Sequence, residues 1–237
     1  MKVLITGGAS GFGAAVASAC AARGDIVYVL DRVPGPGVFH AHDMASPDLA
    51  AWAALADWLA AQGPFDLVVL SAGISATGRF EDIPLQDHHK VTAVNLAGVI
   101  RLVQMLEKDA LAPGARLVFI ASLSCFTGYP GAASYAASKD GLAGFARSLR
   151  APMRKRGVRV QLACPGPMDT PHATRYAPEG SSAKGRMSPE RAAQAVLRSR
   201  SFVVVPGLGP KLAVLAGRVA PQSMTRLMGR VLFSKLK

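Results

Sequence analysis

The sequence predicts an α/β fold in a single domain, with a doubly wound parallel sheet and helices on both of its faces. Short runs that are apolar throughout alternate with longer stretches of helical periodicity along most of the 237 residues. Strands that are buried on both faces have this composition, whereas strands with one solvent-exposed face alternate apolar and polar residues. A glycine-rich turn directly after the first apolar run supports the same fold, in which ligands bind beyond the carboxyl ends of the strands.

Six apolar runs are the expected strands, and each has a length that suits a buried strand. In chain order they are residues 3–6, 26–31, 65–73, 115–122, 158–166 and 202–207. Glycine follows the first run, and a proline–glycine pair closes each of the last two, which marks turns at those points.

Helical stretches lie between these runs. They are expected from the first turn to about residue 23, over 47–62, 87–109 and 134–156, and from Ser188 onward. Ser188 is a favourable N-cap and Pro189 a favourable first helical residue. Residues 171–187 are polar and rich in glycine, proline and serine, and a loop of this length is usually functional or disordered.

Composition narrows the class of protein. Half of the residues are hydrophobic, which is enough for a sizeable core. The three cysteines are far apart and show no metal-ligand spacing, so we expect neither a disulfide framework nor a metal site. No signal-peptide pattern opens the sequence, and no apolar run approaches the ~18 residues of a membrane span. These features predict a cytoplasmic protein.

Positive charge is concentrated in the second part of the chain. The net charge is +12, and residues 143–237 hold 18 Lys and Arg against 3 Asp and Glu, whereas residues 1–142 hold 9 against 12. Such asymmetry indicates an acidic partner, a nucleic acid or an anionic membrane, or else a basic solvated surface with no partner. The basic part has neither interleaved aromatic residues nor a recognition motif, so we do not expect nucleic-acid binding.

The glycine-rich turn TGGASGFG (6–13) predicts a nucleotide site. Gly7 permits the tight turn, while Gly11 and Gly13 let the backbone approach a pyrophosphate and let the following helix pack on the sheet. The N-terminus of that helix offers free N–H groups to phosphate. A plain strand-to-helix turn is the alternative.

Asp31 closes the second expected strand, where a carboxylate can accept hydrogen bonds from adenosine ribose hydroxyls and repel a 2′-phosphate. It favours NAD as the cofactor. Arg32 follows directly and could bind a 2′-phosphate, which leaves NADP as the alternative. Asp31 could also be an exposed strand-end residue without a ligand.

The segment SYAASK (134–139) places a phenol and an ammonium one helical turn apart. Tyr135 and Lys139 therefore share a helix face. A nearby cation favours the phenolate and lowers the tyrosine pKa from its reference value near ~10, which would make a usable acid or base. An isolated tyrosine and lysine with this spacing more often belong to an ordinary helix face without a catalytic role.

Several motifs in one order resemble those of the short-chain dehydrogenase/reductase family, over roughly residues 2–206. They are TGGASGFG, SAG at 71–73, Asn95 in VNLAG, Ser122 in IASLS, Tyr135 with Lys139, and PGPMDT at 165–170. Ser122 precedes Tyr135 by 13 residues, which is the spacing the family uses.

The resemblance implies a Rossmann-like fold and an oxidoreductase that transfers a hydride between a nicotinamide cofactor and an alcohol or carbonyl substrate. Tyr135 would be the general acid/base. Lys139 would lower the pKa of Tyr135 and hold the nicotinamide ribose. Ser122 would donate a hydrogen bond to the substrate oxygen. Asn95 would bend its helix and hold a water that links Lys139 to solvent. A non-catalytic nucleotide sensor or scaffold on the same fold is the alternative.

The resemblance also implies a cofactor-binding set spread over several turns. Within it, Asp43 would meet the adenine and Thr170 the nicotinamide carboxamide. The set is Gly7, Ser10, Gly11, Phe12, Gly13, Asp31, Arg32, Asp43, Met44, Ser71, Ala72, Gly73, Tyr135, Lys139, Pro165, Gly166, Met168 and Thr170.

Two departures from the family pattern stand out. Ser71 replaces the asparagine that usually begins the SAG motif, and we expect altered local packing there with activity retained. The chain also continues to Lys237 without the glycine-rich terminal strand that helps many members form tetramers. We therefore expect a homodimer.

The substrate side is less defined. We expect Leu123, Ser124, Phe126, Tyr129 and Met168 to line a largely apolar pocket. The loop that follows contributes His172, Arg175, Tyr176, Lys184 and Arg186, which either meet an anionic substrate or form a solvated lid.

We expect residues 1–207 to form the nucleotide-binding and catalytic domain, and residues 208–237 to form a basic, amphipathic helical extension packed on it. An apolar stripe in this extension recurs at i, i+3, i+4, i+7 and i+8, at Met224, Leu227, Met228, Val231 and Leu232. Arg226, Arg230 and Lys237 fall on the opposite side. The stripe packs on the core or on a dimer partner, or it makes peripheral contact with an anionic membrane.

Overall fold

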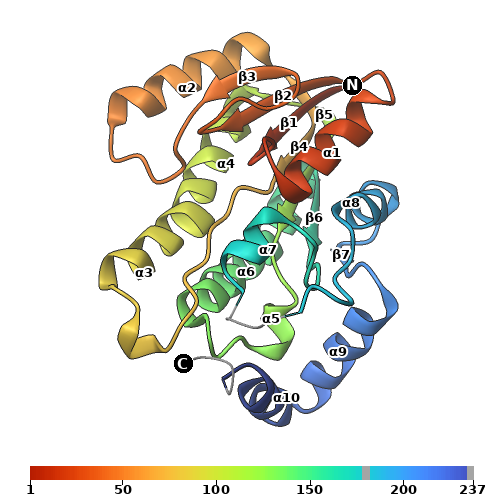
Figure 1. Ribbon diagram of the computed structural model, residues 1–237. Coiled ribbons are helices and arrows are strands. Elements are labelled where there is room, and N and C mark those ends of the chain that lie inside the picture. Colours follow the sequence, from red (N-terminus) through yellow and green to blue (C-terminus); the bar gives the residue numbers. More distant parts are fainter. Residues whose placement is uncertain (178–181, 234–237) are drawn as a thin grey trace.

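The computed structural model describes residues 1–177 and 182–233, with side chains up to Val231. The described residues form one parallel sheet of seven strands in the order β3-β2-β1-β4-β5-β6-β7 (Figure 1). The strands are β1 (Lys2–Thr6), β2 (Ile26–Asp31), β3 (Val38–Ala41), β4 (Phe65–Leu70), β5 (Leu111–Ile120), β6 (Arg159–Ala163) and β7 (Val203–Val204). The predicted doubly wound α/β fold is confirmed.

Helices cover both faces of the sheet (Figure 1). One face packs against α1 (Gly11–Ala21) and α8 (Pro189–Arg198). The other packs against α2 (Leu49–Gln62), α4 (Gly98–Asp109) and α6 (Ala133–Lys155). The remaining described helices are α3 (Leu85–Thr92), α5 (Ser124–Thr127), α7 (Pro171–Arg175), α9 (Leu208–Val219), α10 (Pro221–Met228), a 3₁₀ turn at Phe80–Asp82, and π-helical turns at Ala93–Ala97 and Gly229–Phe233.

The apolar strands fill two separate cores because consecutive side chains of a strand point to opposite faces of the sheet. In β1, Leu4 belongs to the core under α2, α4 and α6, whereas Val3 and Ile5 belong to the core under α1 and α8. All three side chains are completely buried. This explains why these strands read as continuous apolar runs.

Three elements differ from the sequence expectations. The edge strand β3 was not expected, because it is short and no residue in it is fully buried. The helix expected over 87–109 is interrupted by the π-helical turn at Ala93–Ala97. The last strand contains only Val203–Val204 rather than 202–207.

The loop expected over 171–187 contains the short helix α7, which starts after Thr170. The Thr170 hydroxyl caps it by accepting a hydrogen bond from the Ala173 N–H at 3.1 Å. Residues 178–181 of that loop lie outside the described part. Met168 and Met187 then pair as a parallel β-bridge that brings the two ends of the loop together.

The extension after residue 207 is not one helix. Ala220 departs from helical geometry and Pro221 opens α10, which divides the segment in two. Met224 and Met228 are half-buried, whereas Leu227 and Val231 are exposed, so the stripe expected there does not bury as a unit. The side chain of Leu232 and all of Lys237 lie outside the described residues. Among the described helices, none combines the length and apolarity needed to cross a bilayer.

The extension is held to the rest of the protein through α5. Gly217 of α9 lies against the main chain of Phe126, so closely that an added Cβ would overlap the Phe126 carbonyl. The Arg218 guanidinium stacks over the Phe126 ring, 5.1 Å from its centroid. Thr225 of α10 donates a hydrogen bond to the Thr127 carbonyl at 3.5 Å.

We expect Gly217→Ala to weaken the packing of α9 on α5 and to lower the free energy of unfolding by about 1–3 kcal/mol, as overpacked sites do. Gly209→Ala is the matched control, because this residue of α9 has no atom within 4 Å of an added Cβ and alanine is the better helix former. Urea denaturation of both variants measures the effect. Equal stabilities of the two variants would show that the contact does not hold α9.

Candidate active site

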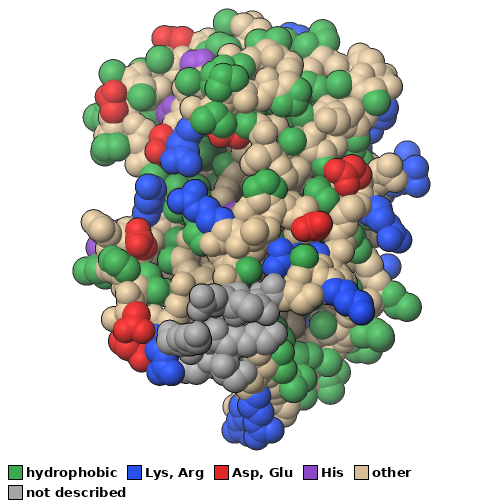
Figure 2. Space-filling model, viewed as in Figure 1, with side chains coloured by type: hydrophobic (Ala, Val, Ile, Leu, Met, Phe, Trp, Pro, Cys, Tyr) green, Lys and Arg blue, Asp and Glu red, His purple; other side chains and the backbone are tan. Residues whose placement is uncertain are grey.

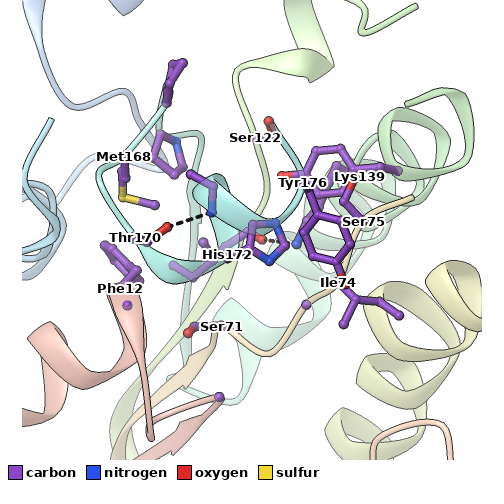
Figure 3. A pocket seen from close by; sticks show the side chains of 18 of the residues that line it. Phe12, Ser71, Ile74, Ser75, Ser122, Lys139, Met168, Thr170, His172 and Tyr176 are labelled. Carbon is purple, nitrogen blue, oxygen red and sulfur yellow. Dashed lines mark hydrogen bonds between the residues drawn. The ribbon is translucent and has the colours of Figure 1, made fainter. Parts of the chain in front are cut away.

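One cavity of about 750 Å³ opens at the carboxyl ends of the strands. Every residue of the predicted cofactor-binding set lines it, from the glycine-rich turn after β1 to Thr170. Ser122, Tyr135 and Lys139 line the same cavity, and Figure 3 shows Ser122 and Lys139 in its wall. The fourth predicted catalytic residue, Asn95, is fully buried behind the wall.

The glycine-rich turn leaves no room for side chains at its centre. Gly7 adopts a φ of +68°, and a Cβ there would lie 2.7 Å from the Ala72 Cα. A Cβ on Gly13 would overlap the Gly7 carbonyl. Ser10 stands at the N-cap of α1 in extended geometry, and its side chain makes no capping hydrogen bond. The first N–H groups of α1 therefore face the cavity as donors for an anion.

A hydroxyl joins the two strands beneath this turn. The Thr6 Oγ1 accepts hydrogen bonds from the N–H groups of Ser71 and Ala72, each at 3.0 Å. Main-chain donors of the SAG motif thus bridge β1 and β4. This contact spans the strands without using the side chain of Ser71, where the family usually has asparagine.

The acidic residues beyond the strands are held by local hydrogen bonds. Asp31 accepts the N–H of Ala9 at 3.0 Å and that of Arg32 at 2.7 Å. Its carboxylate is therefore tied to the glycine-rich turn, and the Arg32 side chain is exposed beside it. Asp43 accepts the Ala45 N–H at 2.9 Å and faces the same cavity.

Asn95 ties two elements behind the cavity. Its Oδ1 accepts the Ile74 N–H at 2.9 Å, while its Nδ2 donates to the Ile74 carbonyl at 2.9 Å and to the Ser138 Oγ at 3.0 Å. It lies in the π-helical turn between α3 and α4. The helix interruption thus presents the amide to the segment after β4 and to α6 at once.

Lys139 is a buried cation. Its residue is 4% exposed, and its Nζ donates to the Ile120 carbonyl at 2.9 Å. The Nζ also lies 5.8 Å from the centroid of the Tyr135 ring. Burial lowers the pKa of Lys139 to about 8.

The pKa of Tyr135 lies above its ordinary value in the chain by itself, whereas the pair with Lys139 was expected to lower it. Burial raises the pKa of Tyr135 to about 12, and a hydrogen bond with Ser122 offsets only part of that increase. The physical reason is that burial removes water from the charged phenolate and so favours the neutral hydroxyl.

Aromatic side chains border the rest of the cavity. The Tyr129 ring lies 6.3 Å from that of Tyr135, and His172 lies 6.4 Å from it on the other side. The Tyr176 ring packs 4.8 Å from His172, one turn further along the chain (Figure 3). His172 is an exposed residue that lines the cavity. Loss of water around its ring, and then the nearby cations Lys139 and Arg175, lower the pKa of His172 to about 4. This imidazole is neutral at pH 7.

The structure changes part of the predicted substrate pocket. Leu123, Ser124, Tyr129 and Met168 line the cavity, and so do His172, Tyr176, Lys184 and Arg186. Phe126 and Arg175 are not among the lining residues. Phe126 instead supports α9, because the short helix α5 turns its ring and main chain toward the extension.

Sequence reasoning missed other lining residues, among them Ser75 and Thr77 after β4, Lys90 of α3 and Met228 of α10. Ser75 and Thr77 follow the SAG motif closely, so their position after a strand end was an available signal. No spacing in the sequence connects Met228 with a cavity whose other walls lie far earlier in the chain.

Comparison with known proteins decides the family. The family model described as short chain dehydrogenase matches residues 1–180. The chain belongs to this family. It is an oxidoreductase of the class that acts on CH–OH and C=O groups.

Individual similarities agree with this assignment. A 3-oxoacyl-[acyl-carrier-protein] reductase, MabA of Mycobacterium bovis, is 34% identical over 175 residues, which are 71% of this chain and 70% of that protein. A short chain dehydrogenase from Burkholderia cenocepacia, solved with NADP, has a TM-score of 0.82 at 20% identity and covers 96% of both chains. One from Burkholderia phymatum, solved with NAD, has a TM-score of 0.78 at 23% identity, covering 95% of this chain and 94% of that one. The last two similarities concern the fold.

The buried lysine of this short-chain dehydrogenase makes stability depend on pH. The pKa of Lys139 is about 8 in the folded chain against an ordinary value of 10.5. Between these values the unfolded state binds more protons, so the lysine's contribution to the free energy of unfolding rises with pH. From pH 8 to pH 10 we expect the wild type to gain about 2 kcal/mol over Lys139→Met.

Urea denaturation of the protein without cofactor measures this difference. Lys108→Met is the control, because Lys108 is an exposed lysine of α4. Its difference from the wild type should stay constant over the same range. A constant difference for Lys139→Met as well would contradict the depressed pKa.

Proposed function

We propose that this short-chain dehydrogenase transfers a hydride between a nicotinamide cofactor and an alcohol or carbonyl substrate, with Tyr135 as general acid/base. The observation that carries the proposal is convergence. Ser122 follows β5, Tyr135 and Lys139 lie on α6, and all three line the same cavity as the glycine-rich turn. A pure nucleotide binder has no need of an acid/base group beside its nucleotide site.

The residues on the nucleotide side fit such a cofactor. The turn around Gly7 and Gly13 is a cradle that a Cβ would fill, and the uncapped N-terminus of α1 offers donors to a pyrophosphate. Asp31 would accept from the adenosine ribose hydroxyls, and Asp43 would meet the adenine. The cofactor, when bound, supplies or accepts the hydride.

NAD is the preferred cofactor in this proposal. The Asp31 carboxylate is fixed against the turn by two main-chain donors, so it stays where a 2′-phosphate would have to sit. Arg32 is exposed and free to turn toward a 2′-phosphate once the carboxylate is gone. Related folds have been solved with NADP and with NAD, so the fold itself does not decide between them.

The proton side of the reaction falls to Tyr135. With a pKa of about 12 its hydroxyl is fully protonated at neutral pH, so it can donate a proton to a carbonyl oxygen that becomes an alkoxide. Ser122 stabilises that oxygen with a second hydrogen bond. In the opposite direction Tyr135 must first lose its proton. In the site with cofactor bound, the positive charges of Lys139 and of an oxidised nicotinamide would both favour that loss.

Asn95 and Lys139 have supporting roles. Asn95 holds the Ile74 main chain and the start of α6 in place, and Lys139 would hold the nicotinamide ribose. The Lys139 ammonium already donates one hydrogen bond, to the Ile120 carbonyl. Its two other N–H groups remain as donors for the ribose and a water.

The cavity favours a substrate with an apolar body and polar ends. Ile74, Leu123, Met168 and Met228 supply apolar wall, while Lys184 and Arg186 stand at the loop. Because MabA is named as a 3-oxoacyl reductase, 3-oxoacyl thioesters belong first in a substrate screen with both cofactors. Absorbance of the reduced nicotinamide reports turnover.

The expected homodimer remains a prediction, which sedimentation velocity tests.

We expect Tyr135→Phe to lower turnover by at least ~10²-fold, because general acid/base catalysis contributes about 10²–10⁴-fold. The variant keeps the ring and loses only the hydroxyl, so cofactor affinity measured by calorimetry should stay within a few-fold. Tyr176→Phe is the matched control, because Tyr176 also lines the cavity and packs on His172. Turnover by Tyr135→Phe near the wild-type rate would refute Tyr135 as the general acid/base, whereas absence of turnover by the wild type across the screen would favour the nucleotide sensor.

We expect Asp31→Asn to reduce the preference for NAD over NADP by at least about tenfold, because one charge repulsion near the 2′-phosphate disappears. Titration of both cofactors against both proteins measures the ratio. The double variant Asp31→Asn/Arg32→Gln separates the lost repulsion from any pairing with Arg32. Tighter binding of NADP than NAD by the wild type would overturn the assignment.

A further inference from the structure

Exposed apolar side chains are concentrated on the extension. Of the fourteen large hydrophobic side chains that are exposed in the described residues, six belong to residues 208–231. Four of them lie on α9, namely Leu208, Leu212, Leu215 and Val219, with exposed fractions of 75%, 60%, 61% and 78%. Single exposed leucines need no explanation, but a group of this kind on one helix does.

These four residues, the α9 row, form one narrow face. They are spaced at i, i+4, i+7 and i+11, so at roughly 100° per residue all of them point the same way. The opposite side of α9 is fixed against the protein, because Val214 and Gly217 are buried there. The row therefore cannot turn inward while α9 keeps its packing on α5.

Basic residues border the row, and acidic residues do not. Lys211 and Arg218 flank it on one side of α9, and α10 adds the exposed Arg226. No acidic residue occurs anywhere from Arg191 to Lys237. Figure 2 shows hydrophobic side chains gathered at the lower right over α9 and Lys or Arg side chains at the bottom over α10.

We propose that the α9 row and its basic border form a surface that docks on an anionic lipid bilayer, with α9 lying in the plane of the interface. Helices that bind in this way combine an apolar face with flanking Lys and Arg, which hold anionic headgroups while the leucines enter the acyl boundary. The chain meets the bilayer from one side and does not cross it.

A second copy of the chain suits this surface less well. In a two-fold dimer the same patch faces itself, so Lys211, Arg218 and Arg226 would approach their own copies. The extension contains no acidic residue to pair with them. Anionic headgroups supply the missing negative charge without a specific partner.

The surface lies next to the cavity. The Thr225 hydroxyl of α10 donates to the Thr127 carbonyl, and Thr127 and Met228 both line the cavity. Only α9 itself and the short helix α5 thus lie between the α9 row and this part of the cavity. Docking would place the cavity close to the bilayer surface.

Co-sedimentation with vesicles tests the proposal. The wild type should bind phosphatidylglycerol vesicles at low salt, bind phosphatidylcholine vesicles at least about tenfold more weakly, and lose binding as salt screens the charges. Leu212→Ser/Leu215→Ser should weaken binding to the anionic vesicles at least about tenfold. Leu49→Ser/Leu85→Ser is the matched control, because these leucines are 71% and 68% exposed on other helices, and it should bind like the wild type.

Lys211→Glu/Arg226→Glu probes the same surface without changing any leucine, and it should also reduce binding about tenfold or more. Sedimentation velocity of every variant reports assembly. The proposal is overturned if the wild type does not bind anionic vesicles at low salt, or if the serine pair at positions 212 and 215 binds as well as its control. A dimer that dissociates in that serine variant, together with absent vesicle binding, would assign the surface to a second copy.

Discussion

The site depends on a close approach that only glycine allows. Gly13 of α1 touches the Gly7 carbonyl, and Gly7 in turn lies against Ala72 at the end of β4. This stack sets the N-terminus of α1 at the carboxyl ends of β1 and β4, where the Thr6 hydroxyl also joins the two strands. Any side chain at these glycines would lift the helix and separate its N–H groups from the rest of the cavity.

The catalytic side depends instead on polar side chains that are buried, above all Lys139 and Asn95. The Lys139 ammonium donates to the Ile120 carbonyl, and within the described residues it forms no salt bridge with a carboxylate. A buried cation without a paired anion is costly, so it favours any ligand that brings electron-rich oxygens to it. Ribose hydroxyls and a polarised substrate oxygen are ligands of that kind.

Much of this was predictable because it is local. The strand runs, the glycine turn and the order of the motifs are properties of short segments, and the predicted cofactor-binding set lines one cavity as a result. Other features depend on tertiary contacts. The raised pKa of Tyr135 comes from burial, the amide of Asn95 in its π-helical turn is bonded to Ile74 and Ser138, and the place of Met228 follows from the helix break at Ala220 and Pro221. Periodicity along one segment carries no information about such partners.

The helix α5 has only four residues, and it faces the cavity on one side and contacts α9 on the other. Its inner side gives Ser124 and Thr127 to the cavity, while its outer side gives Phe126 to α9. Substrate selectivity and the outer surface therefore cannot diverge independently during evolution. A substitution in α5 that admits a larger substrate must also be accepted by Gly217 and Arg218, so we expect changes in these two helices to arise together.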